Sequence, residues 1–460
     1  MAQADTVIEN GLVVTPGRRP ERADIVIAGG RIVDVPASAR GVARVNTIDA
    51  AGKHVLPGPI DGHTHFGYGD GRQDQKLPSE DFLTETRAAA LGGITSVFTF
   101  YRRPEPYVGL VERHIAAAEE RAYIDFGFHL GLQIDAHLDE LPQYFERYGI
   151  TSFKMYMAYR GAEGAQIGIT NADDGYMYEA FGRLAKLPQA VCAVHCENMD
   201  IIGRRKAGLA GQGREDLAAW SESRPAVAEA EAVRRATYLA AAAGARIYIP
   251  HLSCREALRQ AAGARAEFGS DGILIETCPH YLTHTFDSPE GPLAKVNTPL
   301  RSADDQEALW GGIADGTIDT IGSDHLAIDR ARKRSIWDGI PGLPGVATLL
   351  PVMLSEGVNR RSIPIERIAA VVAENPARIW GLFPRKGSLQ PGTDADLVVV
   401  DLELEREVHA ADLRSAADYS LYEGRTLRGW PVLTMVRGEV VARDGSLVGR
   451  PGYGRYLRRD

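Results

Sequence analysis

Histidines recur at the ends of short apolar segments along this chain of 460 residues. His63 and His65 are separated by one residue on a strand-like segment, so both side chains would point to the same side. Two imidazoles that converge from one strand end can form half of a metal site. Taken alone, the pair is more simply explained as two ordinary loop histidines. The metal interpretation therefore requires further ligands elsewhere in the chain.

The rest of the sequence supplies candidates of the right chemical types. His195, His251 and Asp324 each end an apolar segment, and Lys154 is a charged residue inside the apolar run 152–157. Each has a simpler explanation by itself: a hydrogen-bonded core histidine, a helix-capping aspartate, or a buried lysine in an ion pair. Four histidines, a lysine and an aspartate at successive strand ends are hard to explain as a coincidence. Together they predict a metal site with six protein ligands.

The segments that carry these residues alternate with alanine-rich stretches typical of helices. Strands are predicted at residues 95–100, 126–130, 152–157, 190–195, 246–251, 272–277 and 317–323, and helices at 111–121, 226–243 and 304–314. About eight strand–helix units predict an α/β fold, a (β/α)8 TIM-like barrel. In such barrels the chemistry takes place at the carboxyl ends of the strands, where the candidate ligands lie.

The two ends of the chain have a different pattern. Residues 6–35 and 396–441 contain short strands separated by glycine and proline turns, which is typical of hairpins. We therefore expect both termini to form one small β-sandwich domain, residues 1–58 plus 379–460. The barrel would comprise residues 59–378.

The composition argues against several classes of protein. A hydrophobic content of 44% with 25% charged residues is ordinary for a globular protein. The net charge of −9 gives no support for binding nucleic acid or an acidic membrane, and no apolar run approaches the length of a membrane span. The basic clusters 204–206 and 455–459 are expected on the solvated surface. The four cysteines lie in apolar segments without framework spacing, so we expect reduced thiols in a cytoplasmic protein.

Six motifs around the candidate residues are spread over most of the chain. They are Asp61-Gly62-His63-Thr64-His65, Ser152 to Tyr159, Val194 to Asn198, His251-Leu252-Ser253, Glu276 to Leu282, and Gly322 to His325. In combination they resemble the amidohydrolase superfamily, and within it the dihydropyrimidinase and D-hydantoinase family. With Phe383 to Gly387 and the tail Gly452 to Leu457, the resemblance extends from near residue 50 to the end. No single motif is specific, but the combination is.

This resemblance implies a binuclear zinc site. His63 and His65 would bind the more buried Zn²⁺ together with Asp324, and His195 and His251 would bind the more exposed ion. The two ions would activate a bridging hydroxide as the nucleophile.

Lys154 would be carboxylated by CO₂ and would bridge both zinc ions. An amine has no acceptor to offer a metal, whereas its carbamate is an anionic ligand with two oxygens. Formation of the carbamate requires a neutral amine, and burial beside cations lowers the pKa of a lysine.

The implied reaction is the hydrolytic opening of a hydantoin, a dihydropyrimidine or a related cyclic imide. Asp324 would take the proton of the nucleophile and pass it to the departing ring nitrogen. Tyr159 would donate a hydrogen bond to the developing oxyanion; without the family context, aromatic packing would explain it. Asn297, Cys278 and Gly339 complete the expected substrate contacts.

Departures from the family patterns bear on the substrate. Dihydroorotases usually have an arginine two residues after the His-x-His pair, and here that position is Gly67, which argues against this activity. Hydantoinases have a loop whose asparagine meets the ring, but the matching region 338–345 lacks asparagine and is more similar to the Gly-rich loop of allantoinases and dihydroorotases. Allantoinases, in turn, usually lack a tyrosine that matches Tyr159. The loop thus favours an allantoinase and Tyr159 favours a hydantoinase, so allantoinase remains the alternative activity.

A third interpretation is a non-catalytic relative of the dihydropyrimidinases that serves as a scaffold. It is weak, because every ligand position is filled. The resemblance also implies a homodimer or homotetramer, in which the tail 452–459 can contact a neighbouring subunit. The expected partner is a small cyclic amide or imide, with no nucleic acid and no membrane.

Overall fold

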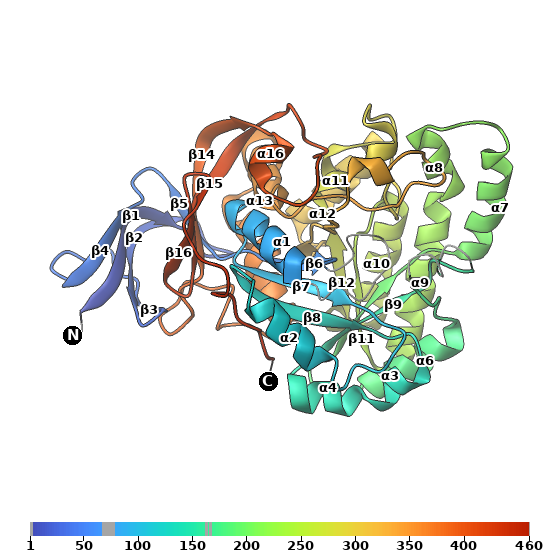
Figure 1. Ribbon diagram of the computed structural model, residues 1–460, viewed down its shortest axis with the longest axis horizontal. Coiled ribbons are helices and arrows are strands. Elements are labelled where there is room, and N and C mark those ends of the chain that lie inside the picture. The colour runs from blue at the N-terminus through green and yellow to red at the C-terminus, as the bar shows by residue number, and fades with distance from the viewer. Residues whose placement is uncertain (1–2, 67–78, 162–163, 165–167, 460) are drawn as a thin grey trace.

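The computed structural model describes residues 3–66, 79–161, 164 and 168–459. Figure 1 shows two parts: a sheet of strands from both termini, drawn in blue and red, and a larger part in which helices surround a second sheet. The chain passes from the first part to the second between β5, which ends at Pro57, and β6, which begins at Ile60.

The larger part is built on eight parallel strands whose spatial order follows their order in the sequence. They are β6 (Ile60–Thr64), β7 (Ser96–Tyr101), β8 (Asp125–Gly131), β9 (Ser152–Tyr156), β10 (Val191–His195), β11 (Arg246–Ile249), β12 (Ile273–Thr277) and β13 (Thr320–Ile321). The ring closes where the backbone N–H of His65 donates to the carbonyl of His325 at 2.8 Å. Strands of a parallel barrel are buried on both faces and therefore have the continuous apolar runs seen in the sequence. The predicted (β/α)8 barrel is confirmed.

Helices pack around this ring of strands (Figure 1). Those of the described residues are α1 (Ser79–Leu91), α2 (Val111–Glu119), α3 (Asp135–Asp139), α4 (Leu141–Tyr148), α6 (Asp174–Leu184), α7 (Met199–Ala210), α8 (Leu217–Ser223), α9 (Ala226–Ala243), α10 (Arg255–Phe268), α11 (Pro279–Thr283), α12 (Ala303–Asp315), α13 (Leu349–Val352), α14 (Ile365–Ala369), α15 (Asn375–Ile379) and α16 (Ala410–Leu413). Helix α9 coincides with the alanine-rich stretch and ends at Gly244, whose left-handed backbone (φ 73°) favours glycine. Within the described ranges, no helix combines the length and the apolar character needed to cross a bilayer.

The terminal strands form a mixed sheet of nine strands. They are β1 (Ala4–Val13), β2 (Glu21–Ala28), β3 (Arg31–Asp34), β4 (Arg44–Asp49), β5 (His54–Pro57), β14 (Leu397–Glu407), β15 (Thr426–Val436), β16 (Glu439–Arg443) and β17 (Ser446–Leu447). Strands β5 and β14 pair antiparallel and so join the two ends of the chain in one sheet. The shared terminal β domain is confirmed, while its exact boundaries at residues 58 and 379 stay a prediction.

A buried ionic network joins the terminal sheet to the barrel. The ammonium of Lys386 lies 2.7 Å from the Asp125 carboxylate and also contacts Asp396, and Arg437 contacts Asp125 from the other side. Asp125 begins β8 of the barrel, whereas Asp396 directly precedes β14 of the terminal sheet. Burial makes each of these charges costly without its partners, so the network fixes how the two sheets meet.

The C-terminal tail lies against the barrel of its own chain. Residues Phe126 and Tyr456 form a parallel bridge, and the guanidinium of Arg459 donates to the Phe128 carbonyl at 2.8 Å. Arg459 is only 1% exposed, so the expectation that residues 455–459 are all solvated was wrong. Each of its three nitrogens donates to an acceptor of the barrel, among them the Gly149 carbonyl, and this compensates for the burial of the charge.

Candidate active site

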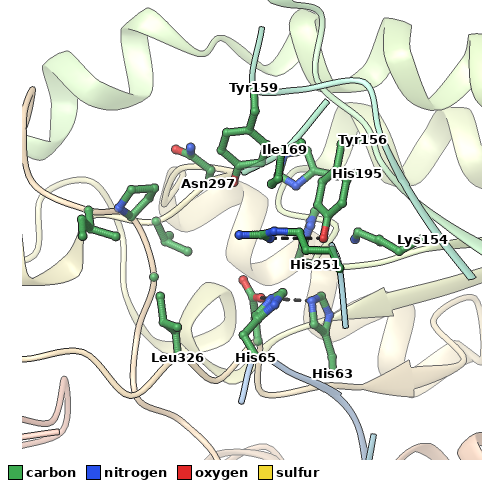
Figure 2. A pocket seen from close by; sticks show the side chains of 16 residues that line it. His63, His65, Lys154, Tyr156, Tyr159, Ile169, His195, His251, Asn297 and Leu326 are labelled. Atoms are coloured by element: carbon green, nitrogen blue, oxygen red, sulfur yellow. Dashed lines mark hydrogen bonds and ion pairs between the residues drawn. The ribbon is translucent and has the colours of Figure 1, made fainter. Parts of the chain in front are cut away.

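All six predicted ligands line one cavity; Lys154 lies inside β9, and the other five lie at or near the carboxyl ends of barrel strands. The six are His63, His65, Lys154, His195, His251 and Asp324. Figure 2 shows His63 and His65 on one side of the cavity, with Lys154, His195 and His251 directed into the same space. The residues that the sequence pattern assigned to strand ends therefore lie together in the structure.

The tightest cluster consists of His63, His65 and Asp324. The Nε2 atoms of His63 and His65 lie 3.0 and 2.9 Å from the same carboxylate oxygen, Oδ1 of Asp324. Ligand atoms of the three residues lie within 4.8 Å of one another, so this group could hold a metal ion. Burial opposes ionisation of Asp324, but the two imidazoles hold its pKa well below the ordinary value. Asp324 therefore offers an anionic oxygen to such an ion.

A second pair of histidines lies beside this cluster. The rings of His195 and His251 are 4.4 Å apart between centroids, and the ring of His251 is 5.4 Å from that of His63. Burial lowers the pKa of both His195 and His251. They are therefore neutral near pH 7, which is the form that binds a metal.

Glu276 contacts one candidate ligand of each group, His63 of the first cluster and His251 of the second pair. Its Oε1 accepts hydrogen bonds from Nδ1 of His63 at 2.6 Å and from the backbone N–H of His251 at 3.0 Å. Its Oε2 accepts a hydrogen bond from the hydroxyl of Tyr248 at 2.6 Å. Burial opposes the charge of His63, but Glu276 and Asp324 raise its pKa to about 9. Because Nδ1 of His63 donates to Glu276, Nε2 is the atom that a metal would bind in place of a proton, which is the arrangement found around metal-binding histidines.

Glu197 has the corresponding role for His195. Its Oε2 accepts from Nε2 of His195 and from the guanidinium of Arg224, each at 2.8 Å. Burial opposes the charge of this carboxylate, but Arg224 and His195 lower its pKa to about 2. The ionised carboxylate fixes the tautomer of His195 and leaves its Nδ1 as the available ligand atom.

Lys154 is the predicted bridging residue. It is 1% exposed, and its Nζ has no hydrogen-bond partner among the described residues. The nitrogen lies 4.7 Å from the ring centroid of Phe100 and 5.2 Å from that of Tyr156. Burial lowers the pKa of Lys154 to about 8. An appreciable fraction of the amine is then neutral near physiological pH, which is the form that can react with CO₂.

Three of the candidate residues have a strained backbone. The φ angles of Tyr159, His251 and Asp324 are 64°, 41° and 51°, in the left-handed region that residues other than glycine rarely adopt. Such a conformation costs on the order of 1–3 kcal/mol and is concentrated at functional sites. Each of these residues lies shortly after the end of a barrel strand, and its side chain lines the cavity.

The predicted substrate contacts fall into two groups. Tyr159 and Asn297 line the cavity, and the ring of Tyr159 lies 5.2 Å from that of His195. Neither side-chain heteroatom of Asn297 has a hydrogen-bond partner among the described residues, although the residue is only 4% exposed. Figure 2 shows Asn297 and Tyr159 next to each other, at the opposite end of the cavity from His63. Both could contact a bound ligand.

Cys278 and Gly339 are not among the described residues that line the cavity. Cys278 is fully buried and precedes α11, and the carbonyl of Gly339 accepts a hydrogen bond from Lys295. Gly67, on which the argument against dihydroorotase depends, lies outside the described residues.

The cavity contains further residues that the sequence did not single out. Arg102 and Tyr156 line it, together with the apolar residues Ile169, Val296, Leu326, Ile340 and Pro341. Arg102 directly follows β7, so the rule that identified the ligands could also have found it. Glu276 belongs to the motif Glu276 to Leu282, but the sequence analysis gave it no role, because nothing in the sequence indicated that it would face His63.

The chain is similar to known proteins over nearly its whole length. Residues 54–441 match the model of the amidohydrolase family. The chain is 36% identical to the D-hydantoinase of Geobacillus stearothermophilus, over 98% of this chain and 96% of the relative. It is 34% identical to the L-hydantoinase of Paenarthrobacter aurescens, over 99% and 98%. The solved dihydropyrimidinase of Brevibacillus agri superposes with a TM-score of 0.90 at 32% identity and covers 99% of this chain and 98% of that one. The chain belongs to the amidohydrolase family.

Proposed function

We propose that this protein is a zinc-dependent hydrolase that opens the ring of a hydantoin, a dihydropyrimidine or a related cyclic imide. The observation that carries the proposal is the convergence of six ligand side chains in one cavity that also contains Tyr159 and Asn297. The similarity to hydantoinases and a dihydropyrimidinase over nearly the whole chain supports the same reaction class.

The donor set fits two zinc ions. His63, His65 and Asp324 would hold one ion, and His195 and His251 the other, because neutral imidazoles and a carboxylate are ordinary zinc ligands. Two bound zinc ions would supply Lewis-acid chemistry, which polarises a carbonyl group and lowers the pKa of water.

A bridge between the two ions would come from Lys154. Its Nζ is buried without a partner among the described residues, and the lowered pKa of about 8 favours the neutral amine that carboxylation requires. Carboxylation would convert this buried, unsatisfied group into an anion with two oxygen ligands.

The remaining groups of the site have roles that follow from their positions. Asp324, whose low pKa keeps it ionised, would accept the proton of the attacking water and deliver it to the leaving ring nitrogen. Tyr159 would donate a hydrogen bond to the oxyanion that develops on the attacked carbonyl. Asn297 could donate to a ring carbonyl and accept from a ring N–H, and the apolar residues Leu326 and Ile340 would exclude water from the ring.

Metal analysis and a substrate panel test the proposal together. The zinc content of the purified protein should be close to two per chain, and zinc-loaded protein should hydrolyse at least one of hydantoin, dihydrouracil, allantoin, dihydroorotate and simple cyclic imides. An Asp324→Asn variant serves as the catalytically inactive control. A zinc-loaded protein that hydrolyses none of these compounds would refute the proposed reaction, and a content well below one zinc per chain would favour a non-catalytic scaffold.

Allantoinase is the second candidate, and one observation favours it. The loop at Ile340, Pro341 and Gly342 lines the cavity without an asparagine side chain, so it offers backbone groups to the substrate. A preference for allantoin over hydantoin and dihydrouracil in the panel would identify that activity.

Assembly, domain limits and location complete the proposal. We propose a homodimer or homotetramer, with residues 1–58 and 379–460 as the terminal domain. The four cysteines are buried and free, which suits a reducing compartment such as the cytoplasm.

A further inference from the structure

Arg102 is a cationic residue in the wall of the proposed active site. It directly follows β7 and is 6% exposed where it lines the cavity. Lys154 and Asp324 belong to the proposed ligand set, so Arg102 is the charged side chain that remains among the described residues lining the cavity. The roles proposed above for ring opening do not use it.

The fold makes room for this side chain. A Cβ atom at Gly131, the last residue of the neighbouring strand β8, would lie 2.9 Å from the Cβ of Arg102. Real Cβ atoms rarely approach so closely. Because Gly131 has no Cβ, the side chain of Arg102 has room at the point where the chain continues beyond β7. The guanidinium then reaches Tyr156, whose hydroxyl lies 3.5 Å from Nη1 and whose ring centroid lies 5.8 Å from Cζ.

Tyr156 connects Arg102 to the centre of the site. The ring of Tyr156 lies 5.2 Å from Nζ of Lys154 and 6.0 Å from the ring of Tyr159. Figure 2 shows Tyr156 and Tyr159 in the same part of the cavity. A substrate held between the proposed zinc site and Tyr159 would therefore have a substituent within reach of Arg102.

The chemistry of a guanidinium defines what that substituent would be. Arginine stays protonated in proteins, and its planar fork of N–H donors matches the two oxygens of a carboxylate. In a largely buried cavity the attraction is screened less than in water, so a fixed cation selects strongly between a charged ligand and a neutral one of the same size. The apolar residues that make up much of the lining, such as Val296 and Leu326, do not distinguish these two ligands.

We propose that the substrate is a cyclic amide that carries a carboxylate on the ring or on a short substituent, and that Arg102 binds this carboxylate. This inference rests on the proposed ring-opening function and defines its substrate class. Arg102 acts on specificity; the proton transfers remain with Asp324.

A matched pair of substrates tests the proposal. Hydantoin-5-acetic acid and its neutral amide have the same ring and nearly the same size but differ in charge. The zinc-loaded enzyme should have a kcat/KM for the acid at least about tenfold above that for the amide. Dihydroorotate and its amide repeat the comparison on a six-membered ring.

Variants of Arg102 then test whether this residue causes the preference for the acid over the amide. Arg102→Met should reduce the acid-to-amide ratio at least about tenfold, mainly through KM of the acid, and leave the amide nearly unchanged. Arg102→Lys, which keeps the charge without the fork, should give an intermediate ratio. The control is Arg103→Met, because Arg103 is not among the described cavity residues and donates instead to the Tyr101 hydroxyl at 3.2 Å. This control should keep the ratio of the parent enzyme.

The possible outcomes separate the two proposals. Turnover of both compounds without preference for the acid would overturn the carboxylate subsite and leave the ring-opening function intact. An equal loss on both compounds in Arg102→Met would overturn it as well, because it would indicate a general role in catalysis. If the zinc-loaded protein hydrolyses neither compound, calorimetry still decides: binding of the acid but not the amide would support the subsite, and equal binding would overturn it.

Discussion

Replacement of Glu276 by glutamine tests whether a buried carboxylate behind the ligands controls metal binding. Glu276 accepts three hydrogen bonds, from His63 Nδ1, the His251 backbone and the Tyr248 hydroxyl. An alanine would leave these three buried donors unsatisfied, at about 1–3 kcal/mol each, and would confuse loss of folding with loss of metal. Glutamine retains the shape and an oxygen for His63 and His251, so the change is confined mainly to the charge.

The expected size of the effect follows from this geometry. The lost charge no longer increases the basicity of His63, and Nε2 of this ring becomes a weaker ligand. Loss of such an outer carboxylate typically weakens metal affinity about 10- to 100-fold, which corresponds to about 1.4–2.7 kcal/mol. The Glu276→Gln side chain can present its NH₂ group to Tyr248, whose hydroxyl can still donate to Thr320, 2.7 Å away, so folding should change little.

Zinc affinity, measured by competition with a fluorescent chelator, checks this prediction. The control is Tyr248→Phe, which removes one hydrogen bond to Glu276 and keeps the carboxylate; it should change the affinity by less than about threefold. Circular dichroism and the unfolding midpoint show whether each variant is folded. A folded Glu276→Gln variant that binds zinc within about twofold of the parent would refute the reasoning, as would an equal loss in Tyr248→Phe.

Three further predictions concern other parts of the molecule. Lys154→Ala should lose zinc and activity, with partial rescue by a short carboxylic acid in assays of zinc content and turnover; full activity without rescue would contradict the bridging role. Asp324→Asn should remain folded by circular dichroism but lose turnover, and a rate within about tenfold of the parent would contradict its role as general base. Lys386→Met should lower the free energy of unfolding by about 3–5 kcal/mol in denaturant titrations, because it leaves the buried Asp125 and Asp396 carboxylates without their shared cation. The KM of this last variant should not change, since Lys386 lies outside the cavity; a stability equal to that of the parent would contradict the structural role.

The barrel and the positions of the candidate ligands were predictable because they depend on local patterns. Parallel strands buried on both faces have short apolar runs, and a polar residue that ends such a run must lie at the carboxyl end of the barrel. His195, His251 and Asp324 satisfy this condition in the sequence alone. Helix α9 was similarly evident, since its alanine-rich run stops at a glycine that ends the helix.

The supporting residues depend on contacts between distant segments and could not be predicted in this way. Glu276 is separated from His63 by 213 residues, and only the folded ring of strands brings the two together. Gly339 was expected at the substrate, but its carbonyl accepts from Lys295, and this contact depends on the path of a long loop. Arg102 also follows a strand end, but arginine is not a metal ligand, so the pattern of candidate ligands did not include it.

The end of the chain, just beyond the tail motif Gly452 to Leu457, also has a physical role. The guanidinium of Arg459 donates to the Ser152 hydroxyl. This hydroxyl lies 2.5 Å from Nδ1 of His129, and Nε2 of the same ring lies 3.0 Å from the Gly62 carbonyl. Burial keeps the pKa of His129 well below its ordinary value, so the ring is neutral, with Nδ1 accepting from Ser152 and Nε2 donating to Gly62. Ser152 begins β9, the strand of Lys154, and Gly62 directly precedes His63 in β6. The end of the tail therefore helps to hold in place, from outside the cavity, the two strands that carry the candidate ligands Lys154 and His63.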